Sequence, residues 1–160
     1  MKVQYLIFSL FALLAVSCSG NKSQSQEEAK ANTTTSDTLY IANVLGQWYI
    51  ENIFFNDSNY VRPTDEVPDS RMYVLFDADS NYSVMTNCNH GAGHYKLIGN
   101  SISFEDAAWT ELACDNMNTE EAMRKILPML GSVEIENDSV MRINSDSEPY
   151  LILLKAKEIK

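Results

Sequence analysis

The sequence has little positive charge and lacks the motifs that most reactions require. It holds 12 lysines and arginines against 22 aspartates and glutamates, so its formal net charge is −10. This balance excludes nucleic acid as a partner, because phosphates require clustered Lys and Arg. G-x-S-x-G, a phosphate-binding glycine loop and H-E-x-x-H are all absent. We therefore predict a protein that is not an enzyme and needs no cofactor.

Long apolar runs are rare as well. Tyr5 to Val16 is apolar apart from Ser9, which is shorter than the roughly 20 residues of a membrane span. Lys2 precedes this run, and Ala15-Val16-Ser17-Cys18 follows it, an order typical of a signal peptide with a lipoprotein cleavage site. We predict a signal peptide over residues 1–17 and lipidation of Cys18. The lipid would anchor the protein in the outer membrane, on its periplasmic or cell-surface face. An ordinary signal peptide, with an incidental cysteine, is the alternative.

The segment after Cys18 lacks large apolar residues. Residues 19–37 are mostly Ser, Gln, Glu, Lys, Asn and Thr. Such a segment cannot bury enough surface to offset its loss of conformational entropy. We predict a lipidated flexible tether over residues 18–38 and one globular domain over residues 39–160.

Cysteine is scarce, with three in 160 residues. If Cys18 carries lipid, Cys88 and Cys114 remain as an even pair in an oxidising compartment, which favours a disulfide. Two free buried thiols are the alternative. His90 and His94, the two histidines, lie close after Cys88, so these cysteines and histidines could also supply four Zn²⁺ ligands. Their spacing matches neither CxxC nor HExxH, and we therefore predict no metal.

The apolar pattern predicts many short strands. The run from Met72 to Phe76 is continuously apolar, as in a strand that is buried on both faces. Gly99-Asn100 and Asn137-Asp138 are typical hairpin turns. Further strands are expected within residues 44–55, 81–87, 93–98, 101–105, 133–136, 140–143 and 150–154.

One helix is predicted between these strands. Apolar residues recur at helical spacing from Asn118 to Leu127, with Asn118 as the N-cap and Glu121 as its capping-box partner. Pro128 ends the helix. The fold class is therefore α+β and β-rich: a strongly curved antiparallel sheet or partly open barrel with one packed helix at about residues 118–127.

Two segments are expected to be loops. Asn56 to Ser70 is long, polar and interrupted by prolines, and Tyr60 and Arg62 are its best candidates for binding. Thr86 to Tyr95 is rich in Gly and Asn and is interpreted as a glycine-containing turn. Neither segment defines a ligand.

Four short motifs in this order resemble the META/HslJ-like domain of secreted and periplasmic bacterial proteins. The family typically has a G-x-W start, a C-N…G-x-Y segment, T-x-x-x-C and an acidic helix start. The matching residues are Gly46-Gln47-Trp48, Cys88-Asn89 with Gly93-His94-Tyr95, Thr110-Glu111-Leu112-Ala113-Cys114, and Glu120-Glu121.

The resemblance implies a β-rich fold with a packed helix and association with heat-shock or envelope-stress proteins, and it does not imply an enzyme. It implies structural roles for the matched residues: Trp48 as a core anchor, Cys88 with Cys114 as a staple, and Gly93 in a tight turn. We therefore expect a non-enzymatic envelope lipoprotein that supports stress resistance or binds an envelope protein. The alternative is a lipocalin-like carrier of a small apolar ligand, since Gly46-Gln47-Trp48 also resembles a lipocalin opening.

Overall fold

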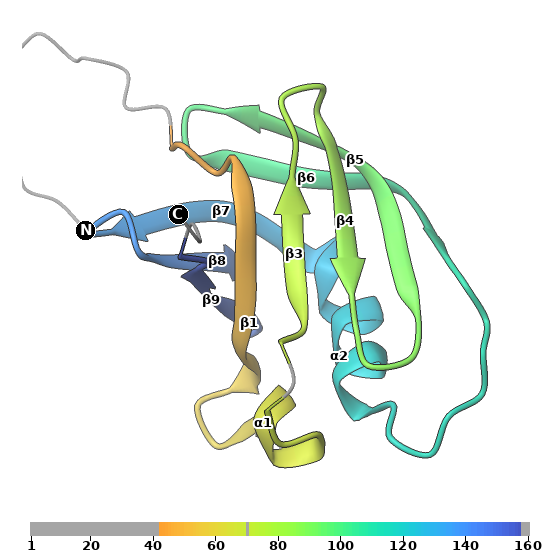
Figure 1. Cartoon of the computed structure of the whole chain (residues 1–160). Helices are drawn as coiled ribbons and strands as arrows, with labels where there is room; N and C mark the ends of the chain where they lie inside the picture. Colours follow the sequence, from red (N-terminus) through yellow and green to blue (C-terminus); the bar gives the residue numbers. More distant parts are fainter. Residues whose placement is uncertain (1–41, 70, 158–160) are drawn as a thin grey trace, which may run out of the picture. The chain divides into compact units, whose positions relative to one another are not determined.

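The computed structural model describes residues 42–69 and 71–157. The predicted signal peptide, Cys18 and the predicted tether lie outside the described residues. Most of the described chain is one antiparallel sheet, and Figure 1 shows that this sheet curves strongly.

The sheet has nine strands in the described residues. Two helices and one 3-10 turn accompany them, and the longer helix lies between the sixth and seventh strands. The elements are β1 (Gly46–Asn56), β2 (Asn59–Val61), α1 (Pro63–Glu66), β3 (Tyr73–Phe76), β4 (Asn81–Met85), β5 (His90–Ile98), β6 (Ser101–Trp109), α2 (Asn118–Ile126), η1 (Leu127–Met129), β7 (Leu130–Glu136), β8 (Val140–Ser145) and β9 (Tyr150–Lys155).

The sheet closes into a barrel through its first and last strands. β1 pairs with β3 over Gly46–Tyr49 and with β9 over residues 48–54, so eight strands form a ring. β2 pairs with β1 over residues 53–56 and adds a strand outside this ring. The predicted curved antiparallel sheet is confirmed, but the barrel is closed rather than partly open, because β1 continues past β3 to pair with β9.

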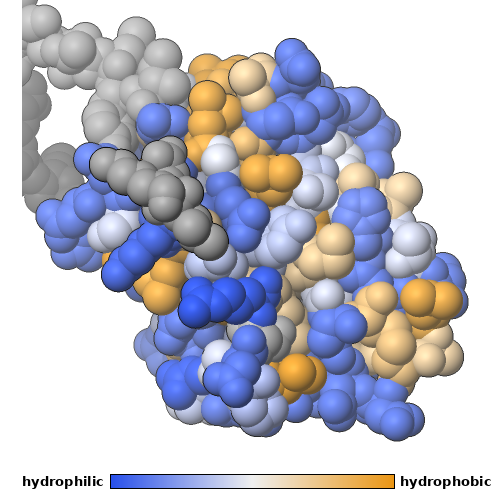
Figure 2. All heavy atoms as spheres, viewed as in Figure 1, coloured by the Kyte–Doolittle hydropathy of each residue, from blue (hydrophilic) through white to orange (hydrophobic). Residues whose placement is uncertain are grey.

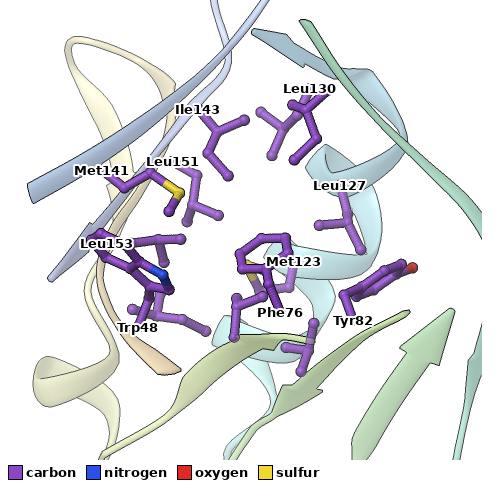
Figure 3. Packing of buried hydrophobic residues seen from close by; sticks show 14 of the residues in the cluster. Trp48, Phe76, Tyr82, Met123, Leu127, Leu130, Met141, Ile143, Leu151 and Leu153 are labelled. Atoms are coloured by element: carbon purple, nitrogen blue, oxygen red, sulfur yellow. The ribbon is translucent and has the colours of Figure 1, made fainter. Parts of the chain in front are cut away.

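Side chains fill the interior of the barrel (Figure 3). The core includes Trp48, Phe76, Met141 and Leu153, which come from four different strands. Helix α2 contributes Met123, which is fully buried, from its apolar face. This dense apolar packing supplies most of the favourable free energy of folding.

The predicted helix is confirmed, but its predicted cap is wrong. The helix starts at Asn118 with Met117 as the N-cap, and the capping residue makes no side-chain hydrogen bond. The carboxylate of Glu66 accepts hydrogen bonds from the amides of Asn118 at 2.6 Å and Thr119 at 2.8 Å. A carboxylate from α1 thus replaces the expected pairing of Asn118 with Glu121.

Three other expectations are corrected. The strand at Tyr73–Phe76 is buried on one face only, since Val74 and Phe76 are buried while Leu75 is exposed. The expected long loop over residues 56–70 contains β2 and α1. In the segment expected to be a turn, only residues 86–89 connect strands, because β5 already begins at His90.

Candidate interaction surface

A buried hydrogen-bond network joins motif residues that are far apart in the chain. Asn89 is buried, and its side-chain oxygen accepts hydrogen bonds from the hydroxyl of Thr110 at 2.7 Å and the amide of Leu112 at 2.8 Å. The side-chain amide of Asn89 donates to the carbonyl of Leu112 at 2.8 Å and to Glu120 at 3.1 Å. Asn89 therefore holds the β4–β5 turn against both α2 and the segment that leads into α2.

Glu120 is a fully buried carboxylate at the centre of this network. It accepts hydrogen bonds from the hydroxyl of Thr86 at 3.3 Å and from Nε of Arg124 at 2.9 Å. Burial alone would lower the pKa of Arg124, but its hydrogen bonds to Glu111 and Glu120 raise it. These donors compensate the buried charge. The carboxylate therefore has a structural role, and its oxygens are engaged in hydrogen bonds within the fold.

A disulfide joins Cys88 to Cys114, with the two Cα atoms 6.2 Å apart. This confirms the predicted bond and excludes two free thiols. The bond crosses 26 residues of sequence and ties the segment before α2 to the β4–β5 turn, where Asn89 also lies. Both sulfur atoms are used in the bond, so the two thiolates that a Zn²⁺ site would need are not available.

His90 and His94 do not come together at one point where they could bind the same metal ion. Both are exposed on β5, four residues apart. A strand rises about 3.3 Å per residue, so their backbones lie roughly 13 Å apart. Nδ1 of His94 is 3.7 Å from the carboxylate of Asp106. Within residues 42–69 and 71–157, no three or more His, Cys, Asp or Glu side chains form a group that could hold a metal ion.

Trp48 and Tyr95 are built into the core. Trp48 is buried, and its ring nitrogen donates to the carbonyl of Val44 at 2.7 Å. Gly46, two residues earlier, has a positive φ of 97°. The hydroxyl of Tyr95 donates to the carbonyl of Asp77 at 2.8 Å. These motif residues contribute packing and hydrogen bonds, as the resemblance implied.

Gly93 lies within β5 rather than in a tight turn. It pairs with Tyr82 on β4, and a Cβ atom at this position would lie 2.5 Å from the carbonyl oxygen of Glu105 and 2.8 Å from the hydroxyl of Tyr82. Glycine is required because the ring of Tyr82 and the backbone of β6 occupy the space of a side chain.

Aromatic side chains form a row on the outer face of the barrel. The strand register pairs Tyr150 on β9 with Phe54 on β1, and Phe54 with Tyr60 on β2. On β8, Asn144 lies opposite Tyr150 and continues the row beyond the aromatic residues. The rings of Phe54 and Tyr150 stack at a centroid distance of 4.3 Å, and those of Phe54 and Tyr60 lie 5.4 Å apart. The neighbours Ile53 and Leu151 are buried, so the row faces away from the core.

Three arginines lie over tyrosines of the same outer face. Further residue pairs lie beside this row on the same outer face: Arg142 on β8 is opposite Ile152 on β9, and Leu154 on β9 is opposite Tyr49 on β1. The guanidinium-to-ring distances are 3.8 Å for Arg142 over Tyr150, 5.1 Å for Arg71 over Tyr49 and 5.8 Å for Arg62 over Tyr60. We call this surface the arginine–tyrosine face, and we define it by Tyr49, Phe54, Tyr60, Arg62, Arg71, Arg142, Tyr150, Ile152 and Leu154.

Two hollows adjoin the arginine–tyrosine face. One, of about 610 Å³, lies between the β1–β2 turn and the β8–β9 turn and is lined by Asp57, Arg142, Glu148 and Tyr150 among others. Burial, and then the charge of Asp57, raise the pKa of Tyr150, whose hydroxyl donates to Asp57 at 3.3 Å. The other, of about 540 Å³, lies beside Tyr49 and Arg71. On the side of the molecule seen in Figure 2, apolar residues lie in separate groups between hydrophilic ones.

Sequence reasoning found only part of this surface. Tyr60 and Arg62 were candidates because they lie in a long polar segment. Arg142 and Tyr150 were missed, although alternation along their strands could have placed them on the outer face. Tyr150 alternates with the buried Leu151, and Arg142 stands between the buried Met141 and Ile143.

Comparisons with known proteins agree with this architecture. The chain is similar to a protein from Burkholderia xenovorans solved by NMR, with 18% identity, a TM-score of 0.58, and coverage of 71% of this chain and 83% of that one. It is also similar to a DUF4847 family protein from Bacteroides vulgatus, with 12% identity, a TM-score of 0.50, and coverage of 71% and 94%. At these identities the likeness shows the fold alone. No curated protein matches the chain.

The described residues contain no helix that is long and apolar enough to cross a membrane. The sequence matches the META domain family over residues 42–158, a range that contains every strand of the barrel and all of the motif residues discussed above. This protein therefore belongs to the META domain family.

Proposed function

We propose that this META domain protein is a non-enzymatic envelope lipoprotein that binds a partner protein through the arginine–tyrosine face. The stack of Tyr60, Phe54 and Tyr150 with flanking arginines carries the proposal. Tyr and Arg are enriched at the energetic centres of protein interfaces. Rings and guanidinium groups that are already held by stacking lose less conformational freedom when a partner binds.

The predicted address supports the same function. The amino-terminal pattern that ends at Cys18 is typical of a lipoprotein, and the Cys88–Cys114 disulfide is typical of an oxidising compartment. A lipid at Cys18 and a tether would present the barrel at the outer membrane. The resemblance to META/HslJ-like proteins supports a role in envelope stress resistance.

A lipocalin-like carrier is the second candidate. The closed eight-strand ring favours it, because rings of this size can hold one small ligand. The packed interior opposes it, because Met123, Leu127 and Trp48 occupy the space that a ligand would need. Native mass spectrometry of the mature chain separates the two, since a carrier would retain an apolar adduct and an interaction protein would not.

The proposed function is tested by complementation of a deletion strain. Survival is measured under heat and detergent stress after restoring the unaltered chain, a Cys18→Ala variant, or a Tyr60→Ser/Tyr150→Ser variant. Ile98→Ser serves as a matched control, because Ile98 is 80% exposed on β5, outside the arginine–tyrosine face.

We expect the unaltered chain and the Ile98→Ser control to restore survival, and the other two variants to fail at equal protein levels. Survival that does not change on deletion would contradict the envelope role. Full complementation by the Tyr60→Ser/Tyr150→Ser variant would contradict the role of the face.

A further inference from the structure

We infer that the partner of the arginine–tyrosine face is a second copy of this chain, which binds through the same face about a two-fold axis. This inference rests on the proposed function of the face and names its partner. Three observations carry it. The centre of the face is apolar, charges of both signs lie beside this centre, and these charges form no ion pairs among the described residues.

The centre of the face consists of apolar and aromatic side chains. Ile152 and Leu154 point outward from β9, since they alternate with buried residues. Leu154 is opposite Tyr49 on β1, and Ile152 follows Tyr150 on the same side of β9, where the ring of Tyr150 stacks on Phe54. The centre of a protein interface is typically apolar and its rim polar. The centre of this face therefore favours an apolar surface on the partner.

Each of the two hollows beside this centre is lined by one arginine and two carboxylates. The first hollow contains Arg142, Asp57 and Glu148, and the second contains Arg71, Glu51 and Asp69. None of these six side chains is part of an ion pair within residues 42–69 and 71–157. Both hollows therefore offer positive and negative groups that a partner can pair.

Arg142 shows how closely the opposite charges alternate. It lies opposite Glu134 in the pairing of β8 with β7. The side-chain oxygen of Asn144 accepts a hydrogen bond from Nε of Arg142 at 2.6 Å, and the side-chain amide of Asn144 donates to Glu134 at 3.3 Å. A partner whose charges all have one sign would meet a like charge beside each opposite one, which costs free energy. The face therefore requires a partner that carries both signs.

A second copy of the same face meets this requirement. In a two-fold contact, residue i of one copy touches residue j of the other, and j touches i. Whether the axis brings like hollows or different hollows together, each arginine can face a carboxylate of the other copy, and the apolar centres can pack on each other. Outside this face, the charge of −10 on each chain opposes self-association. Anchoring of two lipidated copies in one membrane would also raise their effective concentration.

The test is sedimentation velocity of the full mature chain, from low micromolar to near-millimolar concentration. Every sample carries Cys18→Ala, because this change removes the predicted lipid and a thiol that could cross-link two copies. We call this the parent chain. Thermal unfolding of each variant of the parent chain checks that the fold is retained.

Two hollow variants change the charge of both hollows in opposite directions. Arg71→Glu/Arg142→Glu makes each hollow acidic, and Glu51→Lys/Glu148→Lys makes each hollow basic. The control is Lys96→Glu, which reverses an exposed charge on β5, outside the face.

We expect the parent chain to dimerise as its concentration rises, and Lys96→Glu to change the dissociation constant less than about twofold. Each hollow variant alone should dimerise at least about tenfold more weakly, because like charges then face each other. An equimolar mixture of the two hollow variants should dimerise again, because the acidic hollows of one variant face the basic hollows of the other.

A parent chain that stays monomeric over the whole range would overturn the inference. Hollow variants that dimerise as tightly as the parent chain would overturn it too, as would a mixture that dimerises no better than either variant alone. If a charge variant unfolds, Leu154→Gln decides the outcome, because it removes apolar surface from the centre without changing the charge. We expect at least about fivefold weaker dimerisation from Leu154→Gln, and unchanged dimerisation would overturn the inference.

Complementation distinguishes failure of this inference from failure of the proposed function. If the parent chain is monomeric while Tyr60→Ser/Tyr150→Ser still fails to restore stress survival, the face binds a different protein, and only the inference fails. If Tyr60→Ser/Tyr150→Ser restores survival, the proposed function of the face fails as well.

Discussion

Glu66 caps helix α2 by binding Thr119, which lies 53 residues further along the chain. One carboxylate oxygen accepts hydrogen bonds from the amide of Thr119 at 2.8 Å and from its hydroxyl at 2.6 Å. The first amides of a helix lack partners within the helix and lie at the positive end of its dipole. A carboxylate at this position accepts hydrogen bonds from these amides and carries a charge opposite to that end of the dipole. The short helix α1 therefore supplies the cap of α2.

Replacing this cap should weaken the fold. We expect Glu66→Ala to lower the free energy of unfolding by about 1–2 kcal/mol, because two helix amides and one hydroxyl lose their acceptor. Urea denaturation followed by circular dichroism measures the change. Asp65→Ala is the control, since Asp65 is the exposed carboxylate next to Glu66 in the same helix. Equal effects of the two substitutions would show that the cap contributes nothing specific.

The buried carboxylate of Glu120 and its partner Arg124 should show strong coupling. Arg124→Met leaves the Glu120 carboxylate buried without its charged partner, so we expect a loss of about 3 kcal/mol in stability. Adding Glu120→Gln removes the uncompensated charge and should restore part of that loss. A double-mutant cycle by urea denaturation gives the coupling energy. A coupling energy near zero would contradict this account.

The disulfide should stabilise the fold mainly by reducing the conformational entropy of the unfolded chain. Its two cysteines are 26 residues apart, and a closed loop of this length is worth about 3.5 kcal/mol in the chain-entropy model. We therefore expect Cys88→Ser/Cys114→Ser to lower the free energy of unfolding by roughly that amount. Denaturation of the unaltered chain with and without a reductant should reproduce the difference. Identical curves under the two conditions would contradict it.

Tyr82 should make the domain sensitive to alkaline pH. Burial, and then the charge of Asp106, raise the pKa of Tyr82. The folded state thus keeps the phenol proton to higher pH than the unfolded chain does. This contribution to stability is complete below about pH 10, the usual pKa of tyrosine, and is lost as the pH rises through the folded pKa. The buried hydroxyl also has no hydrogen-bond partner among the described residues.

We expect Tyr82→Phe to raise stability by about 1 kcal/mol at neutral pH and to reduce the loss of stability above about pH 10. Urea denaturation at pH 7, 10 and 11 measures both effects. Tyr95→Phe is the contrasting variant, because it removes the 2.8 Å hydrogen bond to the carbonyl of Asp77 and should destabilise the domain. Equal destabilisation by the two substitutions would contradict the assignment.

Part of the candidate surface could be predicted from the sequence. Tyr60 and Arg62 stood out because they lie in a long polar segment, and loops of that length are often functional. The stacking of Phe54 on Tyr150 was out of reach, because it depends on the pairing of β1 with β9, which are separated by most of the domain. The pairing of Arg124 with Glu120 follows the local i,i+4 spacing of a helix, whereas its ion pair with Glu111 depends on how α2 packs against the segment before it.

The sequence by itself determined most of the strands, the helix at Asn118–Ile126 and the family, and it favoured the pairing of Cys88 with Cys114. The turn at Gly99-Asn100, the strand that follows it and the helix at Asn118–Ile126 depend on side-chain period and backbone preference within a few residues. The tertiary structure decided the closure of the barrel, the cap from Glu66 and the arginine–tyrosine face. Each of these joins residues distant in the chain, and such contacts form only after register and core packing fix which strands and helices become neighbours.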